Sequence, residues 1–153
     1  MALDRKKPVT NLQLQKIMFL LQGYWLKKTG QELFCETIKH GRIQPLIFSV
    51  EKEFKYWASA PIEEKAVYFS CNKNRIKEPN VGQKFAKKLK KITNEMLDYD
   101  RRKMINLFFE NDVSKQPTIV NNEYMKQTWT NFTEYQPNEI IQKYCEVTKK
   151  LVK

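Results

Sequence analysis

Apolar residues recur at helical spacing along most of the chain, and the first such stretch has recognisable start and stop signals. Thr10 or Asn11 caps a predicted helix over residues 12–28, and Gln13 follows Thr10 at the spacing of a capping box. Gly30 ends the pattern. Because the apolar residues cover more than one narrow stripe, we expect a central and largely buried helix.

The next stretch predicts a second helix that begins at a proline. Pro45 suits the first turn of a helix, and the core face repeats at spacings of four, four and three. The residues of this face are Leu46, Val50, Phe54 and Trp57. Residues 65–71 combine β-branched and aromatic side chains, so they form either a short strand or the end of a short helix.

Residues from about Gln83 onward predict the most clearly amphipathic helix of the sequence. Its apolar face carries Phe85, Leu89, Ile92 and Met96. Its basic face carries Lys84, Lys87, Lys88 and Lys91. Asp100 caps a continuation through residue 109, and a loop follows around residues 111–117.

The last part of the chain predicts two further helices. A short one is expected around residues 124–129, and Pro137 starts the final one. The apolar positions of the final helix are Ile140, Tyr144, Val147 and Leu151. The fold class is therefore mainly α: a compact single-domain bundle, residues 1–153, of five or six helices, with one or two short strands near residues 65–71.

The charge balance adds that the predicted bundle is strongly basic. The sequence has 28 Lys and Arg against 17 Asp and Glu, a net charge of +11. Such an excess favours encounters with nucleic acid or an acidic protein surface, although a lysine-rich solubilising surface is the alternative. No apolar run is long enough to span a membrane, and no secretory signal is recognisable, so a cytoplasmic location is expected.

The sequence offers little material for catalysis or for a cofactor. It has one histidine, three widely spaced cysteines and no glycine-rich phosphate loop, so we expect no catalytic, metal or cofactor site. Cys35 and His40 are close enough for a nucleophile and its base, but no third orienting group accompanies them. We expect Cys35 to serve in packing and His40 to lie in a solvated loop.

The stretch from residue 8 to residue 24 reads Pro-Val-Thr-Asn-Leu-Gln-Leu-Gln-Lys-Ile-Met-Phe-Leu-Leu-Gln-Gly-Tyr. It resembles the opening of the Panacea (SocA-like) antitoxin and adaptor domain. The resemblance covers residues 8–57, although Gly41 and Gln44 replace a tryptophan and a glycine of the usual pattern. Residues 58–153 share only helical character with the family. The resemblance implies a non-enzymatic domain that neutralises a toxin or delivers it to a protease by stoichiometric binding.

Two groups of residues are candidates for contact with a partner. The first group would bind an anionic partner, with an exposed helix face as the alternative: Lys84, Lys87, Lys88, Lys91, Arg101 and Arg102. The second group would supply aromatic contacts, with core packing as the alternative: Trp129, Phe132 and Tyr135. The expected partner is an acidic or nucleic-acid-binding protein, such as a toxin or a nuclease.

Two other functions remain open on the sequence. A phage-encoded inhibitor of a host defence nuclease, similar to an anti-CRISPR protein, would use the same basic surface against the enzyme or its guide RNA. A nucleic-acid-binding regulator would use that surface against phosphates, with strongly salt-dependent affinity.

Overall fold

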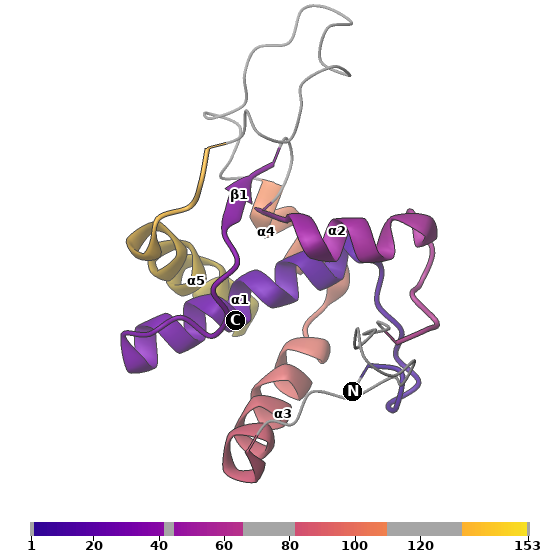
Figure 1. The fold of residues 1–153 in the computed structure, drawn as a ribbon, viewed down its shortest axis with the longest axis horizontal. Helices are drawn as coiled ribbons and strands as arrows, with labels where there is room; N and C mark the ends of the chain where they lie inside the picture. Colours follow the sequence, from indigo (N-terminus) through magenta and orange to yellow (C-terminus); the bar gives the residue numbers. More distant parts are fainter. Residues whose placement is uncertain (1, 42–44, 66–81, 110–132, 153) are drawn as a thin grey trace, which may run out of the picture.

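The computed structural model describes residues 2–41, 45–65, 82–109 and 133–152, which form a mainly helical fold around one central helix (Figure 1). This helix, α1, spans Asn11–Thr29. Thr10 is its N-cap: the Thr10 hydroxyl accepts a hydrogen bond from the Gln13 backbone amide at 3.3 Å, and the Gln13 side chain accepts one from the Thr10 amide at 2.9 Å. The predicted capping box is therefore confirmed.

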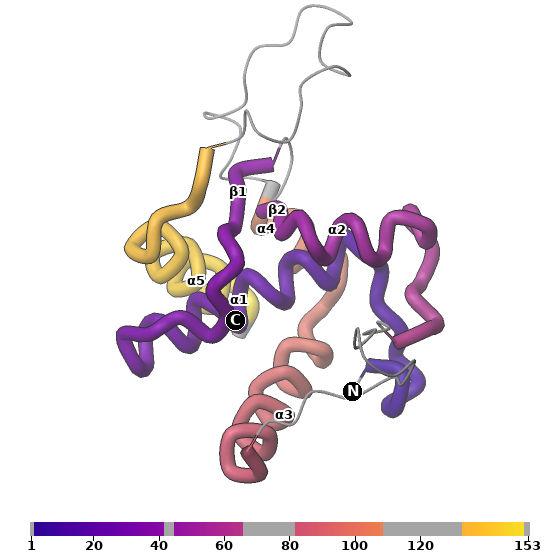
Figure 2. Tube along the Cα trace, in the orientation of Figure 1, coloured from indigo at the N-terminus to yellow at the C-terminus, as the bar shows by residue number. Residues whose placement is uncertain are grey.

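A short antiparallel sheet follows α1, where the sequence predicted the start of a helix. Strand β1 spans Ile38–His40 and strand β2 spans Pro45–Ile47, with Ile38 opposite Ile47; Figure 2 shows them side by side. Helix α2 begins only at Phe48 and runs to Phe54, and the 3₁₀ helix η1 spans Lys55–Trp57.

The prediction of a helix starting at Pro45 was wrong because a distant side chain fixes this backbone as a strand. The side chain of Gln15, on α1, accepts a hydrogen bond from the Ile47 amide at 2.8 Å and donates one to the Ile47 carbonyl at 3.2 Å. Strands were expected near residues 65–71, of which residues 66–71 lie outside the described part of the chain. The strands described lie earlier in the chain, at Ile38–His40 and Pro45–Ile47.

The chain just before the last helix runs along the free edge of β1. The His40 amide donates to the Thr133 carbonyl and the Tyr135 amide to the Ile38 carbonyl, each at 2.8 Å. Residues far apart in the sequence thus complete the small sheet, and Tyr135 is brought against the core.

The three later helices agree with the sequence prediction. Helix α3 spans Gln83–Leu97, α4 spans Arg101–Phe109 and α5 spans Pro137–Val152. Asp100 caps α4, since its carboxylate accepts a hydrogen bond from the Lys103 amide at 2.6 Å. The loop and the short helix expected around residues 111–117 and 124–129 lie outside the described residues.

The core lies where α1, α4 and α5 meet. Phe19 and Phe108 are fully buried with ring centroids 5.5 Å apart, edge to face, and Tyr135 packs edge to face on Phe19 at 5.0 Å. Helix α3 contacts α1 but projects from this body (Figure 1). Its apolar side still joins the core, because Ile92 and Met96 are buried there.

Candidate partner-binding surface

The lysines of α3 form one solvent-facing stripe, which we call the lysine face and define as Lys84, Lys87, Lys88 and Lys91. All four are exposed. At about 100° per residue they fall within an arc of about 100° on the helix. Ile92 and Met96 are buried on the other side, which confirms the predicted separation of basic and apolar positions.

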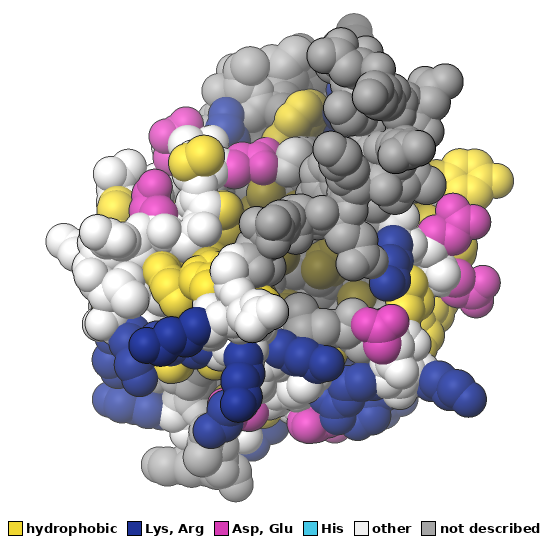
Figure 3. Space-filling model, turned by 60° about the horizontal axis from the view of Figure 1, so that its bottom comes forward, with side chains coloured by type: hydrophobic (Ala, Val, Ile, Leu, Met, Phe, Trp, Pro, Cys, Tyr) yellow, Lys and Arg dark blue, Asp and Glu magenta, His cyan; other side chains and the backbone are white. Residues whose placement is uncertain are grey.

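The helix that carries this stripe has little negative charge of its own. Helix α3 contains five lysines and one acidic residue, Glu95. Among the described residues, none of the four lysines of the lysine face forms an ion pair. Figure 3, in which the lower end of Figure 1 comes forward, shows Lys and Arg side chains gathered in a band, with a few Asp and Glu side chains beside them. The positive potential here is therefore available to a partner.

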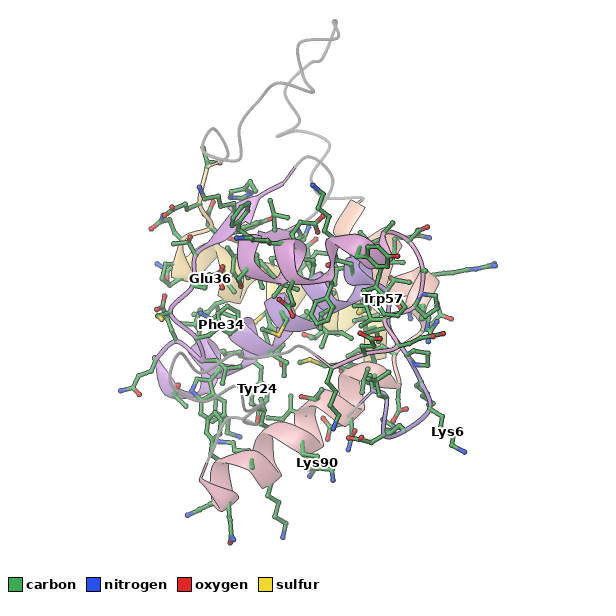
Figure 4. All side chains as sticks on the ribbon, turned by 45° about the vertical axis from the view of Figure 1, so that its right-hand side comes forward. Lys6, Tyr24, Phe34, Glu36, Trp57 and Lys90 are labelled. Atoms are coloured by element: carbon green, nitrogen blue, oxygen red, sulfur yellow. The ribbon has the colours of Figure 1, made fainter. Side chains whose placement is uncertain are left out.

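Most lysine side chains of α3 extend into solvent, and Lys88 has one aromatic neighbour. Figure 4 shows Lys90 on α3, on the side facing away from the other helices. The Lys88 ammonium lies 4.8 Å from the centre of the Trp25 ring, and Trp25 packs edge to face on Phe85 at 5.0 Å. One edge of the lysine face therefore touches α1.

The C-terminal end of α3 is tied to the N-terminal segment of the chain. The Asp98 carboxylate accepts from Arg5 at 2.7 Å and from Lys7 at 2.9 Å, and Arg5 also donates to the Asn94 carbonyl at 3.1 Å. The hydrogen bonds from Lys7 and Arg5 lower the pKa of Asp98. These contacts hold the end of α3 and leave the lysine face uncovered.

The two arginines predicted for the same surface belong to a different helix. Arg101 and Arg102 are exposed in the first turn of α4. The Arg101 guanidinium donates a hydrogen bond to the Pro8 carbonyl at 2.9 Å, so it is partly engaged within the chain. The lysine face therefore consists of α3 residues alone.

The predicted aromatic group is not assembled as a surface by the described residues. Tyr135 is only 8% exposed and packs between Phe19 and the imidazole of His40, whose ring centre is 3.5 Å away. It is a core residue, because the edge of β1 draws it inward. Trp129 and Phe132 lie outside the described residues.

The expectations for Cys35 and His40 were both wrong. Cys35 is exposed rather than packed. His40 lies in β1 rather than in a solvated loop: its side chain is 15% exposed, and Nε2 is 3.7 Å from a carboxylate oxygen of Glu139. Strand pairing with Pro45 and the edge contact with Thr133 explain this position.

Two buried glutamines of α1 have roles inside the fold. Gln15 bonds the backbone of β2, and Gln22 does the same for the loop after α1. The Gln22 side chain accepts from the amides of Leu33 and Phe34 at 2.9 and 3.3 Å and donates to the Phe34 carbonyl at 3.1 Å. Both glutamines are buried, so they serve the architecture rather than a surface.

Other residues of the same stretch also face inward. Gly23 permits a close crossing with α5, because an added Cβ would lie 2.4 Å from the Tyr144 Cβ. Lys16 is fully buried, with its ammonium 5.7 Å from the centre of the Phe108 ring. Burial lowers its pKa to about 7.

No protein family, characterised protein or solved structure matches this chain. The case for a function of the lysine face therefore rests on the geometry and charge of this chain alone.

Two further properties bear on the candidate functions. In the described parts of the chain, no group of three or more His, Cys, Asp or Glu residues is placed to hold a metal ion. No helix there is both long enough and apolar enough to cross a membrane. The lysine face is thus the strongest candidate for function in the described residues.

Proposed function

We propose that this chain is a non-catalytic binding domain that holds a partner protein in a stoichiometric complex. The lysine face of α3 meets an acidic surface of the partner. The observation that carries this proposal is the stripe of four exposed lysines, without an ion pair among the described residues, on the helix that projects from the body. The resemblance of residues 8–57 to antitoxin and adaptor domains supports the same class of function.

An acidic protein is a better partner for this stripe than a nucleic acid. The lysine face contains no arginine, whose planar guanidinium reads bases and phosphates through paired hydrogen bonds. The aromatic rings at its edge, Trp25 and Phe85, pack against each other, and Lys88 lies over Trp25. Rings that are covered in this way do not offer a platform on which bases stack.

The test compares the wild-type protein with the variant Lys84→Gln, Lys87→Gln, Lys88→Gln, Lys91→Gln. Complexes are isolated from native host cells, and a co-purifying partner is identified, produced separately and reconstituted at measured stoichiometry. If each lysine contributes about 0.5–1 kcal/mol, the variant binds roughly 30- to 1,000-fold more weakly. Higher salt should weaken the wild-type complex in the same direction.

A matched control removes the same charge from elsewhere on the surface. The exposed lysines used for it are Lys52, Lys55, Lys149 and Lys150, each changed to glutamine. This control should retain most of the affinity. Equal losses in both variants, or the absence of any partner that reconstitutes, contradict the proposal. Tight binding of duplex DNA at about 150 mM salt that requires the lysine face, with no protein partner, selects the regulator instead.

A further inference from the structure

The C-terminal turn of α1 borders the lysine face and carries two lysines of its own, Lys27 and Lys28. Both are exposed. They differ in direction, since successive residues of a helix are rotated by about 100°. Measured from Trp25, Lys28 lies about 60° round the helix and Lys27 about 160°.

Each of the two lysines has an aromatic neighbour. The Lys28 ammonium lies 5.7 Å from the ring centre of Tyr24, whose ring packs edge to face on Tyr144 at 6.3 Å. The Lys27 ammonium lies 6.0 Å from the ring centre of Tyr144, on α5. Both lysines therefore lie over one pair of packed tyrosines, and the helical rotation alone distinguishes their directions: Lys28 is nearer to Trp25 than Lys27 is.

Trp25 connects the two helices at this point. Its ring touches Phe85 on the apolar side of α3 and the ammonium of Lys88 on the lysine face. A partner that covers Lys88 must therefore pass close to the last turn of α1, where Lys28 is exposed.

We propose that the surface for the acidic partner spans two helices: Lys28 of α1 extends the lysine face, and Trp25 is a positioning residue that holds Lys88 at the junction. The occupant is a carboxylate-rich surface of a partner protein, which the charge of both helices complements. This inference rests on the proposed function. A lysine at the end of a helix also stabilises the helix dipole, but Lys27 and Lys28 share that role and face different directions.

Charge reversal at single positions tests the extension. The variants are Lys28→Glu, the matched control Lys27→Glu, and Lys84→Glu within the lysine face. Binding of fluorescently labelled poly-L-glutamate to each full-length variant is followed by fluorescence anisotropy at several salt concentrations. Lys28→Glu and Lys84→Glu should each weaken binding about 5- to 10-fold, and Lys27→Glu by less than about 2-fold. Thermal unfolding should shift equally for the two α1 variants, because both alter the same helix end.

The outcomes separate this inference from the proposed function. Equal losses for Lys28→Glu and Lys27→Glu, with a larger loss for Lys84→Glu, overturn the two-helix surface and leave the lysine face in place. Equal losses for all three variants overturn both. If duplex DNA binds more tightly than poly-L-glutamate at about 150 mM salt, and only DNA binding responds to Lys28→Glu, the partner is a nucleic acid and the proposal is wrong.

A double-mutant cycle tests the positioning role of Trp25. Trp25→Leu should weaken binding of poly-L-glutamate about 3-fold, and Trp25→Phe should restore most of it, because a ring is retained beneath Lys88. In the Lys88→Gln background, Trp25→Leu should have no further effect. A full additional loss in that background shows that Trp25 does not act through Lys88.

Discussion

Replacing Lys16 with methionine should make the stability of this protein less dependent on pH. Lys16 is 0% exposed, and its ammonium faces the Phe108 ring. A second lysine, Lys143, lies 5.8 Å from the centre of the same ring and is also buried. Burial lowers the pKa of Lys16 from 10.5 to about 7, so the folded protein favours the neutral amine.

The sign of the effect follows from proton binding. Between about pH 7 and pH 10.5 the unfolded chain keeps the Lys16 proton and the folded chain loses it, so the free energy of unfolding rises with pH. From about pH 7.5 to pH 9.5 the gain is about 2.5 kcal/mol, at about 1.4 kcal/mol per pKa unit. Methionine has a similar length and no charge, so Lys16→Met should remove this slope and stabilise the fold by up to about 4 kcal/mol at pH 7.5.

Urea unfolding followed by circular dichroism gives these free energies at each pH. The range should stop near pH 9.5, because burial raises the pKa of Tyr144 to about 12. Above about pH 10 the unfolded chain loses this proton while the folded chain keeps it, which lowers the free energy of unfolding. Lys90→Met, on the exposed side of α3, is the matched control and should keep the wild-type slope. A wild-type protein equally stable at both pH values, or equal slopes in Lys16→Met and wild type, would refute the reasoning.

Two further substitutions probe the packing of α1 against its neighbours. Gly23→Ala should destabilise the fold by about 1–3 kcal/mol, because the new methyl group would lie 2.4 Å from the Tyr144 Cβ; thermal unfolding measures this. Gly82→Ala is the control: nothing lies within 4 Å of its new methyl group, and only the N-cap preference of α3 is affected, at less than about 1 kcal/mol. Equal effects at both glycines argue against a tight crossing. Gln15→Met should cost about 2–4 kcal/mol, because both backbone groups of Ile47 lose their side-chain partner. Hydrogen exchange should show faster exchange of the Ile47 amide, and unchanged protection would contradict the role assigned to Gln15.

Helices whose signals are local could be predicted from the sequence. The capping box of Thr10 and Gln13 and the cap at Asp100 depend on residues three positions apart, so each could be identified without the fold. The lysine face was predictable for the same reason, because its members recur within two turns of one helix.

Features that depend on distant partners could not be predicted in this way. Pro45–Ile47 has the apolar content and the proline of a helix start, but the side chain of Gln15 and the pairing with β1 make it a strand. Tyr135 is buried because its amide joins β1 from almost one hundred residues away.

The sequence also did not predict that α1 contributes to the proposed surface. Lys28 looks like an ordinary basic residue at a helix end. Only the contact of Trp25 with Phe85 and Lys88 shows that this end adjoins α3. Lys16 was similarly unexpected, since lysines are rarely buried and its neighbour Phe108 is over ninety residues away.

The two buried glutamines of α1 change how sequence variation in this chain should be judged. Each side-chain amide both accepts from and donates to the backbone, as a peptide group of a neighbouring strand would. Glutamate has nearly the same shape, but its ionised carboxylate has no donor and brings a charge into the core. At Gln15 and Gln22, replacement by glutamate, usually scored as conservative, is therefore among the most damaging changes. Relatives of this chain should be recognised by glutamines at these two positions rather than by general sequence similarity.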